Sequence, residues 1–450
     1  MPPEPDPNRR RRAVIVGGGF GGLAAAQRLR DADVDVTLVD RTNHHLFQPL
    51  LYQLAAGGLS QGGCALPIRM ALKRSRNTRV LMAEVTGLDP ERRQVALDRG
   101  ERLDYDSLIV ASGAETSYFG HDEWRYVTYG LKSLSDAVGL RNRIYSAFEE
   151  AERAKDDATR DEWLTFVVVG GGATGVELAG MLGILAGHRE QHTFAGIDPR
   201  KTRVILLDAG DRVVPAFSEK LSAKAARYLA ELGVTLREGA RATAIDERGV
   251  TVEVGGSTER ISTRTVIWAA GVRAAPLSET LAQATGATTD RAGRIEINPD
   301  LTVPGHPEIS AIGDMTSLRG PGDKPLPGLA TVAIQQARHV ANAIREGRPG
   351  ASTPFRYFDK GALAVVGRGK AVCEVRGLEL SGRPAFFTYL GVHLYYLGGG
   401  VGRRLNVLTD WTTARIGRPQ SPVIEAGLDN AERVPASAEA TGWEPSTSSR

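Results

Sequence analysis

A glycine-rich turn close to the N-terminus constrains the fold of this chain more than any other feature. The stretch AVIVGGGFGGLAAAQRL places Gly17, Gly19 and Gly22 in the spacing Gly-x-Gly-x-x-Gly, between a β-branched strand and an alanine-rich helix. Glycines in this pattern permit a tight turn and let backbone N–H groups approach a pyrophosphate at the helix N-terminus. The next apolar run, VDVTLVD, ends at Asp40, whose carboxylate can accept hydrogen bonds from a ribose. We therefore expect a Rossmann-like unit that binds a dinucleotide.

A second copy of this pattern lies further along the chain. The stretch TFVVVGGGATGVELAG places Gly170, Gly172 and Gly175 in the same spacing, and the later run TRVILLD ends at Asp208. Two such turns with two strand-terminal acids predict two bound dinucleotides, which in turn indicate electron transfer between them. A carboxylate at Asp208 repels a 2′-phosphate and so favours NADH over NADPH, although Arg212 lies close by in sequence and could soften this preference.

Composition and charge exclude several other classes of protein. The chain has 450 residues, 42% of them hydrophobic, and a formal net charge of only +3, so we expect two or three domains and no broad nucleic-acid-binding face. Cys64 and Cys373 are far apart in sequence and form no CxxC pair, and the cysteines and histidines form no cluster with metal-ligand spacing. We therefore expect no metal site, and we expect Cys64 to be a buried thiol.

The N-terminus contains neither the pattern of a secretory leader nor that of a membrane span. Arg9–Arg12 precede an apolar run of only Ala13–Val16, which is too short for the apolar core of a signal sequence. Residues 1–12 are expected to be disordered. No apolar run elsewhere in the sequence approaches the length needed to cross a bilayer.

Three further apolar strands end in small or acidic residues. PEISAIGDMT contains Gly313-Asp314, YDSLIVASGA contains Ser112-Gly113, and RTVIWAAGV contains Ala270-Gly271. Together with the two glycine-rich turns, this set resembles the FAD- and NAD(P)H-dependent pyridine nucleotide oxidoreductases. The resemblance implies that the first turn holds FAD, that Asp314 binds the ribityl-phosphate portion of the flavin, and that an NAD(P)H domain is inserted into the FAD domain.

The expected fold class is therefore α/β, with two Rossmann-like dinucleotide-binding domains and a C-terminal amphipathic helical region. We assign residues 13–120 and 290–350 to the FAD domain and residues 121–289 to the NADH domain. Residues 351–418 are expected to form the C-terminal region. Residues 419–450 are rich in Pro, Ser, Ala and Glu and are expected to be a disordered tail.

Four stretches make the resemblance more specific: residues 44–60, HHLFQPLLYQLAAGGLS; 105–120, YDSLIVASGAETSYFG; 170–180, GGGATGVELAG; and 265–277, TVIWAAGVRAAPL. They are similar to the type II NADH dehydrogenases, the single-subunit, non-proton-pumping NADH:quinone oxidoreductases of respiratory chains. The resemblance implies non-covalent FAD, NADH as substrate, and menaquinone or ubiquinone as acceptor. It also implies a homodimer and peripheral attachment to the cytoplasmic face of the membrane.

The resemblance, together with the glycine-rich turns, assigns a set of residues to cofactor binding. These residues are Gly17, Gly19, Phe20, Gly21, Gly22, Asp40, Arg41, Val85, Ser112, Gly113, Asp314, Ala330, Gly170, Gly172, Thr174, Gly175, Asp208, Ala270 and Gly271.

Glu177 has two possible roles. We expect it in the first turn of the helix after the second glycine-rich turn, where a carboxylate stabilises the helix through the macrodipole. The family resemblance instead places Glu177 beside the nicotinamide and the flavin, as a catalytic residue that shapes hydride transfer, and we favour this interpretation.

The stretch LATVAIQQAR, residues 329–338, predicts the first turns of a packed helix. In the resembled family this helix lies under the flavin and carries the pattern Ala-Gln-x-Ala-x-Gln, so Ala330, Ala333 and Gln335 match while Thr331 replaces the first glutamine. The resemblance assigns Gln335 to a quinone carbonyl and Thr331 to the same catalytic site. The alternative is that Gln335 is a solvent-facing amide.

The stretch HHLFQPLLYQL after Asp40 leaves several possibilities open. Leu46, Leu50 and Leu51 can be core residues. Four neighbours can approach the flavin or the quinone, and the sequence does not choose among them: His44, Phe47, Gln48 and Pro49.

The C-terminal region predicts a pair of interfacial helices. Residues 385–402 contain no formally charged group, and a break is expected at Gly398–Gly400. Steps of three and four residues predict one apolar helical stripe, with arginines on or near the other side. The stripe is Leu390, Leu394, Leu397, Val401, Leu405, Leu408 and Trp411, and the arginines are Arg403, Arg404, Arg415 and Arg418. The alternative is a helix pair packed on the protein or on a dimer partner.

Three other functions were weighed. A sulfide:quinone oxidoreductase needs cysteines beside the flavin, and only Cys64 and Cys373 exist. A soluble NAD(P)H-dependent reductase of a protein acceptor leaves the amphipathic C-terminal segment unexplained. A regulatory flavoprotein without turnover does not need two intact dinucleotide turns.

Overall fold

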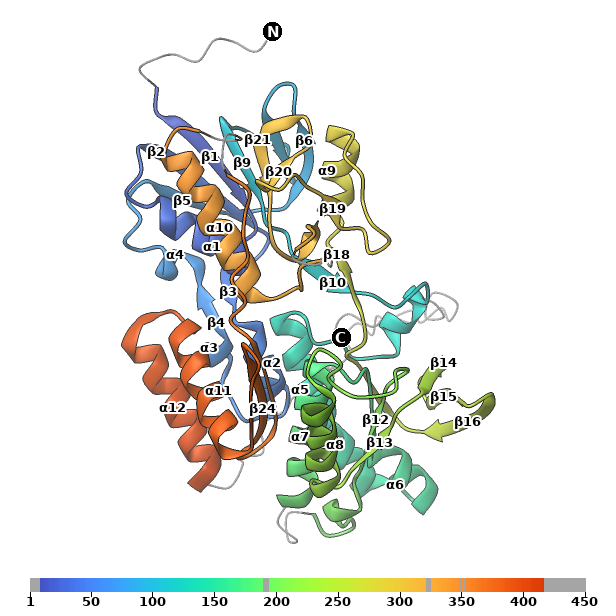
Figure 1. The fold of residues 1–450 in the computed structure, drawn as a ribbon. Helices are drawn as coiled ribbons and strands as arrows, with labels where there is room; N and C mark the ends of the chain where they lie inside the picture. Colours follow the sequence, from blue (N-terminus) through green and yellow to red (C-terminus); the bar gives the residue numbers. More distant parts are fainter. Residues whose placement is uncertain (1–8, 189–193, 321–324, 349, 351–352, 417–450) are drawn as a thin grey trace, which may run out of the picture.

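The structure is a computed structural model that describes residues 9–188, 194–320, 325–348, 350 and 353–416. Two α/β lobes lie one above the other in Figure 1, and a C-terminal helix pair packs beside the lower lobe. The predicted α/β class with two Rossmann-like units is confirmed. Residues 1–8 and the expected tail, 419–450, lie outside the described residues.

The first lobe, the upper one in Figure 1, is built on a six-stranded sheet in the order β20-β21-β9-β1-β2-β5. All pairings are parallel except that of β20 with β21. Helices α1 (Phe20–Leu29) and α10 (Ala330–Arg345) pack against each other. The strands are β1 (Arg11–Val16), β2 (Val34–Asp40), β5 (Thr78–Met82), β9 (Ser107–Val110), β20 (Thr302–Val303) and β21 (His306–Ala311).

The first strand begins earlier than the sequence indicated. Order was expected from Ala13, but β1 starts at Arg11. The reason is charge pairing with a distant residue: Asp106 accepts a bond from the Arg9 guanidinium at 2.7 Å and from the Arg12 backbone N–H at 2.6 Å. These bonds extend the sheet into a segment whose own composition is purely polar.

The second lobe is built on a four-stranded parallel sheet in the order β13-β12-β11-β17. Its strands are β11 (Thr165–Val169), β12 (Arg203–Leu207), β13 (Val234–Arg237) and β17 (Thr265–Trp268). Strands β11 and β17 are fully buried, and β12 is buried after its first residue, as expected of a parallel sheet covered on both faces, whereas the edge strand β13 is buried only at Val234. The main helices of this lobe are α5 (Leu134–Arg153), α7 (Ala173–His188) and α8 (Glu219–Glu231).

A short ribbon of two strands connects the lobes. Strand β10 (Ala114–Thr116) pairs antiparallel with β18 (Val272–Ala274) at the level where the lobes meet in Figure 1. The chain therefore passes from the first lobe into the second along β10 and returns along β18. This is the insertion that the sequence predicted, and the exact boundaries at 120, 290 and 350 stay a prediction.

The C-terminal region packs on the second lobe through a three-stranded sheet. Strands β23 (Ala362–Gly367), β24 (Lys370–Val375) and β25 (Leu378–Ser381) are followed by α11 (Arg383–Tyr396) and α12 (Gly400–Ile416). The predicted break is confirmed, because Gly398 and Gly399, between the helices, and Gly400, the first residue of α12, all have positive φ. We call α11 and α12 the C-terminal hairpin.

The prediction of one apolar stripe along the hairpin is wrong. Leu397 is buried and Trp411 packs against the core of the second lobe, whereas Val401 and Leu405 are 69% and 56% exposed. The predicted spacing of apolar residues, every three or four positions, continued through the glycine break. Because the chain reverses at this break, the residues before it and those after it face different surroundings. Arg403 was expected on the polar side but is buried, and its guanidinium donates to backbone carbonyls.

One hydrophobic core joins parts of the chain that lie far apart in sequence. It contains Phe47 and the following leucines, helices α5 and α7, strands β23 and β24, and Tyr389 of the C-terminal hairpin. The second lobe is therefore completed by a segment of the first.

The remaining elements are β3 (His44–Leu46), η1 (Gln48–Leu50), α2 (Leu51–Ala55), α3 (Gln61–Cys64), β4 (Ala65–Pro67), α4 (Ile68–Ala71), β6 (Val85–Asp89), β7 (Gln94–Leu97), β8 (Arg102–Asp104), η2 (Asp122–Tyr126), α6 (Asp157–Trp163), η3 (Pro199–Lys201), β14 (Ala240–Asp246), β15 (Gly249–Val254), β16 (Ser257–Ser262), α9 (Leu277–Thr285), β19 (Ile295–Glu296), η4 (Gly313–Met315) and β22 (Thr316–Ser317).

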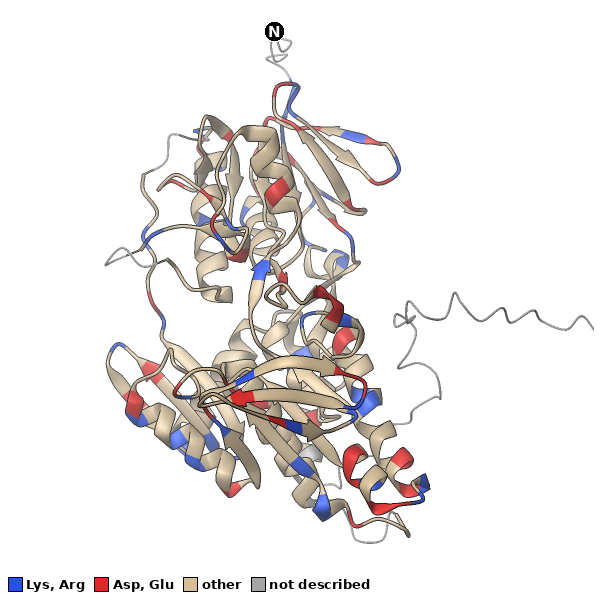
Figure 2. Ribbon diagram, turned by 90° about the vertical axis from the view of Figure 1, so that its right-hand side faces the viewer, with Lys and Arg blue, Asp and Glu red and all other residues tan. Residues whose placement is uncertain are grey.

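The surface carries both signs of charge close together. Figure 2 shows acidic and basic residues interspersed on the face that carries the β14–β16 hairpins. Arg260 and Asp246, for example, form an ion pair at 2.7 Å there. Among the described residues, no helix is both long and apolar enough to cross a membrane.

Replacement of Gly180 by alanine tests the contact between α7 and the C-terminal sheet. A Cβ at Gly180 would lie 1.8 Å from the carbonyl oxygen of Val366, so Gly180→Ala forces α7 and β23 apart. We expect a loss of at least 1–3 kcal/mol in the free energy of unfolding, the usual cost of overpacking.

The matched control is Gly187→Ala on the same helix, where no atom lies within 4 Å of an added Cβ. It should raise stability by about 0.5–1 kcal/mol, because alanine is the better helix former. Denaturant unfolding that gives equal effects for the two variants would contradict the packing described.

Candidate functional site

The first glycine-rich turn is a backbone cradle at the end of β1. Gly17 has φ +101°, and a Cβ at Gly22 would lie 1.8 Å from the carbonyl oxygen of Gly17, so neither position can carry a side chain. Gly19 precedes α1, with no atom within 4 Å of an added Cβ, and the backbone there is open to a ligand. The Gly18 N–H donates to Asp40 at 2.6 Å, which fixes the carboxylate at the rim of the cradle.

The second turn repeats this geometry at the end of β11. Gly170 has φ +112°, and a Cβ at Gly175 would again lie 1.8 Å from the carbonyl oxygen of the first glycine. Asp208 accepts from the backbone N–H of Gly171 and, at 2.8 Å, from that of Gly210. Two cradles with matching glycines and matching carboxylates are the main feature of the site.

Each cradle carboxylate keeps capacity for a ribose hydroxyl. Asp40 accepts three bonds, from the Gly18 N–H and from the backbone and hydroxyl of Thr42, and Asp208 accepts two. A carboxylate has about four lone-pair positions, so both can accept one more bond. Arg212 is the residue that could soften the preference against a 2′-phosphate, and its guanidinium donates to the carbonyl of Pro215 at 3.1 Å.

Other residues predicted to bind the first dinucleotide surround the first cradle. Phe20 and Gly21 begin α1, with Gly21 against Ile312, and Arg41 is exposed just after β2. Gly113 has φ +71° after β9. Ser112 donates to the Met315 sulfur at 3.2 Å, Val85 packs on the cluster that contains Val16 and Val39, and Ala330 begins α10.

Asp314 and Lys132 lie close enough for their opposite charges to interact. Asp314 lies in η4, and burial raises the pKa of its carboxyl group although Lys132 acts in the opposite direction. Burial also lowers the pKa of Lys132. Both side chains are half-buried, and the opposite charge of each partner offsets part of the effect of burial on the other.

The residues predicted around the second cradle lie at the carboxyl edge of the second sheet. Gly172 and Thr174 are exposed at the start of α7. Ala270 and Gly271 follow β17, and a Cβ at Gly170 would lie 2.7 Å from the backbone nitrogen of Ala270. The cradle and the end of β17 therefore form one continuous surface.

Glu177 is buried between α7 and the C-terminal sheet. The expectation that it lies in the first helical turn is wrong, because α7 begins at Ala173. The stabilising effect of the macrodipole falls off beyond the first turn, so this role is weakened. Glu177 accepts from the backbone N–H of Val365 at 3.2 Å, and burial raises the pKa of its carboxyl group to about 8.

The first turns of α10 contact an aromatic segment that follows the helix in sequence. The hydroxyl oxygens of Thr331 and Tyr357 lie 3.2 Å apart. The Gln335 amide donates to the carbonyl of Phe358 and accepts from its N–H, both at 3.0 Å. The Gln335 amide is therefore bonded to the backbone of the protein and is not a free, solvent-facing amide. Its role toward a quinone stays a prediction.

The neighbouring Gln336 is a site residue that sequence reasoning missed. It is buried, and its side-chain oxygen accepts from the backbone N–H of Gly313 at 2.7 Å. This bond links α10 to the turn that contains Asp314. A signal was present, because Gln336 lies four residues from both Val332 and Val340, which are buried on the same face.

A buried hydrogen-bond chain connects the first lobe with both helices of the C-terminal hairpin. Trp411 donates to Gln53 at 2.7 Å, Gln53 donates to Tyr52 at 2.9 Å, and the hydroxyls of Tyr52 and Tyr389 lie 3.0 Å apart. Burial raises the pKa of both tyrosines, and the Glu177 carboxyl group contributes to the shift. Sequence reasoning missed this chain, because its members come from distant segments.

The segment after β2 divides differently from the alternatives considered. Leu50 and Leu51 are core residues, as is Phe47. Gln48 is exposed and His44 is half-buried. The histidine closest to the first cradle is His45, which was not considered: its Nδ1 lies 3.0 Å from the carbonyl oxygen of Gly18.

An aromatic row leads from the first cradle to the C-terminal hairpin. Phe20 contacts His45 and Phe47 edge to face, with ring centroids 5.0 and 5.5 Å apart. His393 contacts Phe47 at 5.9 Å and stacks on Tyr389 at 3.7 Å. Burial lowers the pKa of His393 to about 4, so this histidine is neutral at physiological pH.

Both cysteines are buried. Cys64 donates to the carbonyl of Leu50 at 3.4 Å, and burial raises the pKa of its thiol to about 12. Cys373 lies within β24. The prediction of a buried thiol at Cys64 is confirmed. Within the described residues there is no cluster of three or more potential metal ligands.

Comparisons with known proteins agree with this geometry. Residues 11–337 match the model of the pyridine nucleotide-disulphide oxidoreductase family. The chain is 45% identical over 418 residues to the type II NADH:quinone oxidoreductase Ndh of Mycobacterium tuberculosis, covering 91% of this chain and 89% of that relative. It is 30% identical over 394 residues to the type II NADH:quinone oxidoreductase of Staphylococcus haemolyticus, covering 86% and 95%.

Solved structures support the fold. NDH2 from Plasmodium falciparum, in complex with NADH, has a TM-score of 0.83 at 20% identity and covers 92% of this chain and 100% of that one. The sulfide:quinone oxidoreductase from Aquifex aeolicus has a TM-score of 0.69 at 18% identity, covering 90% and 92%.

We predict that Asp208 sets the preference for NADH over NADPH. Asp208→Asn removes the negative charge and keeps one side-chain oxygen, which can accept from the N–H of Gly171 or of Gly210 but not from both. We expect the ratio of kcat/KM for NADH to that for NADPH to fall by about tenfold, equivalent to ~1.4 kcal/mol. Steady-state kinetics with both dinucleotides measure this ratio, and an unchanged ratio would remove Asp208 from the specificity site.

Glu177 predicts a specific pH dependence of stability. Because its pKa rises from 4.5 in the unfolded chain to about 8 in the folded protein, the folded protein binds this proton more tightly. The stabilisation is complete below pH 4.5 and is lost as the pH rises through about 8.

Glu177→Gln cannot ionise and keeps an acceptor for the Val365 N–H. The stability of the wild type minus that of this variant should therefore decrease with rising pH, by up to ~1.4 kcal/mol per unit. Unfolding measured across this range gives the difference directly. A difference that does not change with pH is incompatible with a buried, protonated Glu177.

Proposed function

This chain belongs to the type II NADH:quinone oxidoreductases, within the pyridine nucleotide-disulphide oxidoreductase family, and on that premise we propose how its residues divide the reaction. The protein transfers electrons from NADH to a quinone. The observation that carries the proposal is the repeated cradle: the same glycines and the same strand-terminal carboxylate occur at the ends of β1 and β11. One cradle serves a resident cofactor and the other serves NADH.

We assign the first cradle to non-covalent FAD. The fit is supported by Gly17 and Gly22, where any Cβ would fill the turn, and by the open backbone at Gly19. Asp40 would accept a hydrogen bond from a ribose hydroxyl, and Asp314 would hold the ribityl-phosphate portion, as the family resemblance implies. When bound, FAD supplies an electron carrier that accepts two electrons from NADH and passes them to the quinone.

We assign the second cradle to NADH. Gly170, Gly172 and Gly175 receive the pyrophosphate at the N-terminus of α7, where backbone N–H groups and the macrodipole favour negative charge. Asp208 accepts from the adenosine ribose and discourages a 2′-phosphate. The nicotinamide then extends over Ala270-Gly271 toward the first lobe.

We assign the acceptor side to the first turns of α10. Ala330 is small, and Gln335 holds its amide against Phe358 through one of its two N–H groups. The second N–H can donate to a quinone carbonyl. Thr331 is shorter than the glutamine of the family pattern, and it is held by Tyr357, so this position shapes the quinone pocket with less donor capacity.

We assign proton handling to Glu177. Reduction of a quinone to a quinol takes up two protons, and a carboxyl group with a pKa of about 8 holds and releases a proton near neutral pH. Glu177 lies in the low-dielectric core beside Val365, and it influences the titration of Tyr52 and Tyr389. This proposal keeps Glu177 as a catalytic residue, as the family resemblance implies, and adds a proton-handling role to the expected effect on hydride transfer.

We also propose that the C-terminal hairpin binds a membrane surface peripherally at the cytoplasmic face. Exposed apolar residues on both helices support this, since Val401, Leu405 and Leu408 recur with helical spacing on α12 and Phe387 and Tyr395 do so on α11. The homodimer implied by the family resemblance is part of the same proposal.

The function is tested on the purified protein with added quinone. We expect heat to release FAD, NADH oxidation to depend on the quinone, and the protein to float with anionic liposomes. Electron transfer to a ferredoxin but not to a quinone would favour a soluble protein reductase instead. Protein that stays in the soluble fraction would remove the membrane assignment alone.

Gln335→Ala tests the acceptor side. Loss of one hydrogen bond of ~1 kcal/mol should raise the KM for quinone by roughly five- to tenfold and leave the KM for NADH unchanged.

Two controls separate this effect from packing. Phe358→Ala keeps the backbone groups that Gln335 binds, and Arg338→Ala changes an exposed residue of the same helix. Both should leave the KM for quinone close to that of the wild type. If Phe358→Ala reproduces the effect of Gln335→Ala, the amide only positions the aromatic segment and does not contact the quinone.

A further inference from the structure

Phe119 combines an exposed aromatic ring with a backbone conformation that side chains avoid. It has φ +53° and is 68% exposed, in the loop between β10 and η2. For a bulky residue a positive φ is an outlier, which persists only when the surroundings enforce it. The loop is held by two bonds: Trp268 donates to the carbonyl of Ser117 at 2.9 Å, and the Ser117 N–H donates to Gly271 at 3.3 Å.

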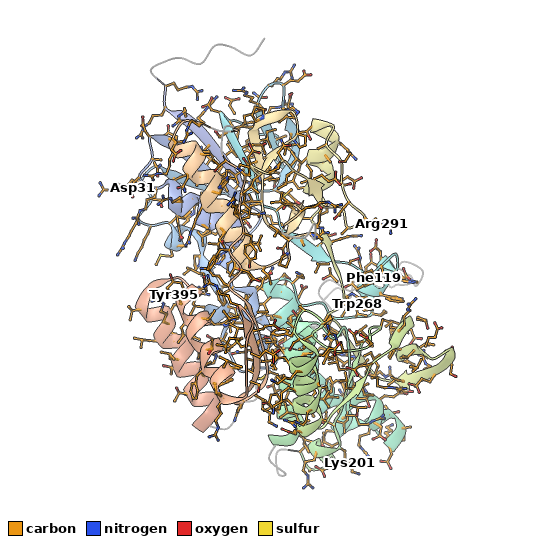
Figure 3. The ribbon with its side chains drawn as sticks, in the orientation of Figure 1. Asp31, Phe119, Lys201, Trp268, Arg291 and Tyr395 are labelled. Atoms are coloured by element: carbon orange, nitrogen blue, oxygen red, sulfur yellow. The ribbon has the colours of Figure 1, made fainter. Side chains whose placement is uncertain are left out.

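The ring of Phe119 lies directly on Gly271. A Cβ at Gly271 would lie 2.3 Å from the ζ carbon of the ring, so this position needs a glycine. The ring also contacts Trp268, with centroids 6.3 Å apart. Figure 3 shows Phe119 and Trp268 close together where the lobes meet, on the side away from the C-terminal hairpin. The aromatic ring is thus held over the backbone that follows β17.

The topology of the second sheet identifies what passes over that backbone. In the order β13-β12-β11-β17, the chain leaves β11 through the cradle and α7 to reach β12, while β17 pairs on the other side. A dinucleotide binds across such a switch point. Asp208, at the end of β12, lies on the adenosine side, so the nicotinamide half extends over the end of β17. Gly271 and the Phe119 ring are on that half.

We propose that Phe119 is a binding residue for the nicotinamide half of NADH, with its ring forming one wall of the nicotinamide pocket. The proposal rests on the assignment of the second cradle to NADH. A flat apolar ring packs against a flat nicotinamide and keeps water from one face of it. This accounts for the exposed ring and for the strained backbone of the loop.

The test compares two ligands that share the adenosine half. The holoenzymes of the wild type, Phe119→Ala and Phe119→Asn are titrated with NAD+ and with ADP-ribose by calorimetry. Asparagine tolerates a positive φ, so the second variant keeps the loop conformation. We expect the Kd for NAD+ to rise roughly three- to tenfold, the range for one lost aromatic stack, and the Kd for ADP-ribose to stay the same.

Two outcomes would overturn the proposal. Unchanged NAD+ binding in both variants shows that the ring only packs on Trp268, and equal weakening of NAD+ and ADP-ribose shows that the loop acts on the cradle as a whole. Tyr126→Ala is the matched control, because Tyr126 is 53% exposed in the adjacent η2. This variant should bind both ligands like the wild type. If the wild type binds neither ligand, the assignment of the second cradle fails, independently of Phe119.

Discussion

The approach of helix α7 to strand β23 is the interaction on which the rest of the structure depends. Gly180 lets the helix backbone reach the carbonyl of Val366, and one turn earlier Glu177 accepts from the N–H of Val365. The same helix begins at the second cradle, so its position fixes where a dinucleotide pyrophosphate can bind. The same strand belongs to the sheet that carries the C-terminal hairpin. A single close contact therefore sets the position of the second cradle relative to the C-terminal hairpin.

Burying a carboxyl group in such a contact is costly, so its presence there calls for an explanation. Burial of a carboxyl group without a charge partner favours the neutral acid, and Glu177 responds by a rise of its pKa to about 8. A hydrophobic residue of the same size would pack there at lower cost. A carboxyl group whose pKa lies at about 8, near the hydrogen-bonded Tyr52 and Tyr389, fits the proton-handling role that we propose for Glu177.

Much of the fold follows from local sequence signals, for identifiable physical reasons. The cradles could be predicted because positive φ at Gly17 and Gly170, and backbone contact at Gly22 and Gly175, exclude every other residue. The start of α10 at Ala330 likewise follows from local periodicity. These features depend on short stretches of chain, which a single sequence displays directly.

The parts that could not be predicted depend on partners far away in sequence. Gln335 bonds to the backbone of Phe358, 23 residues further along the chain, and Arg403 is buried because its guanidinium donates to the carbonyls of Gly62, Gly63 and Leu397. The sequence neighbours of Gln335 and of Arg403 give no indication of these bonds. The apolar stripe of the C-terminal hairpin failed for a related reason, since its periodicity was carried through a glycine break that reverses the chain.

We propose that one chain joins an NADH site to a quinone site through a bound flavin. Anaerobic sequential mixing tests this most directly: the holoenzyme is mixed with one equivalent of NADH, and then with a menaquinone or ubiquinone analogue, while the flavin absorbance is followed. We predict that NADH bleaches the flavin band and that the quinone restores it, each step at least as fast as steady-state turnover. A bleached enzyme that the quinone fails to reoxidise, or a flavin that NADH fails to bleach, would contradict the account.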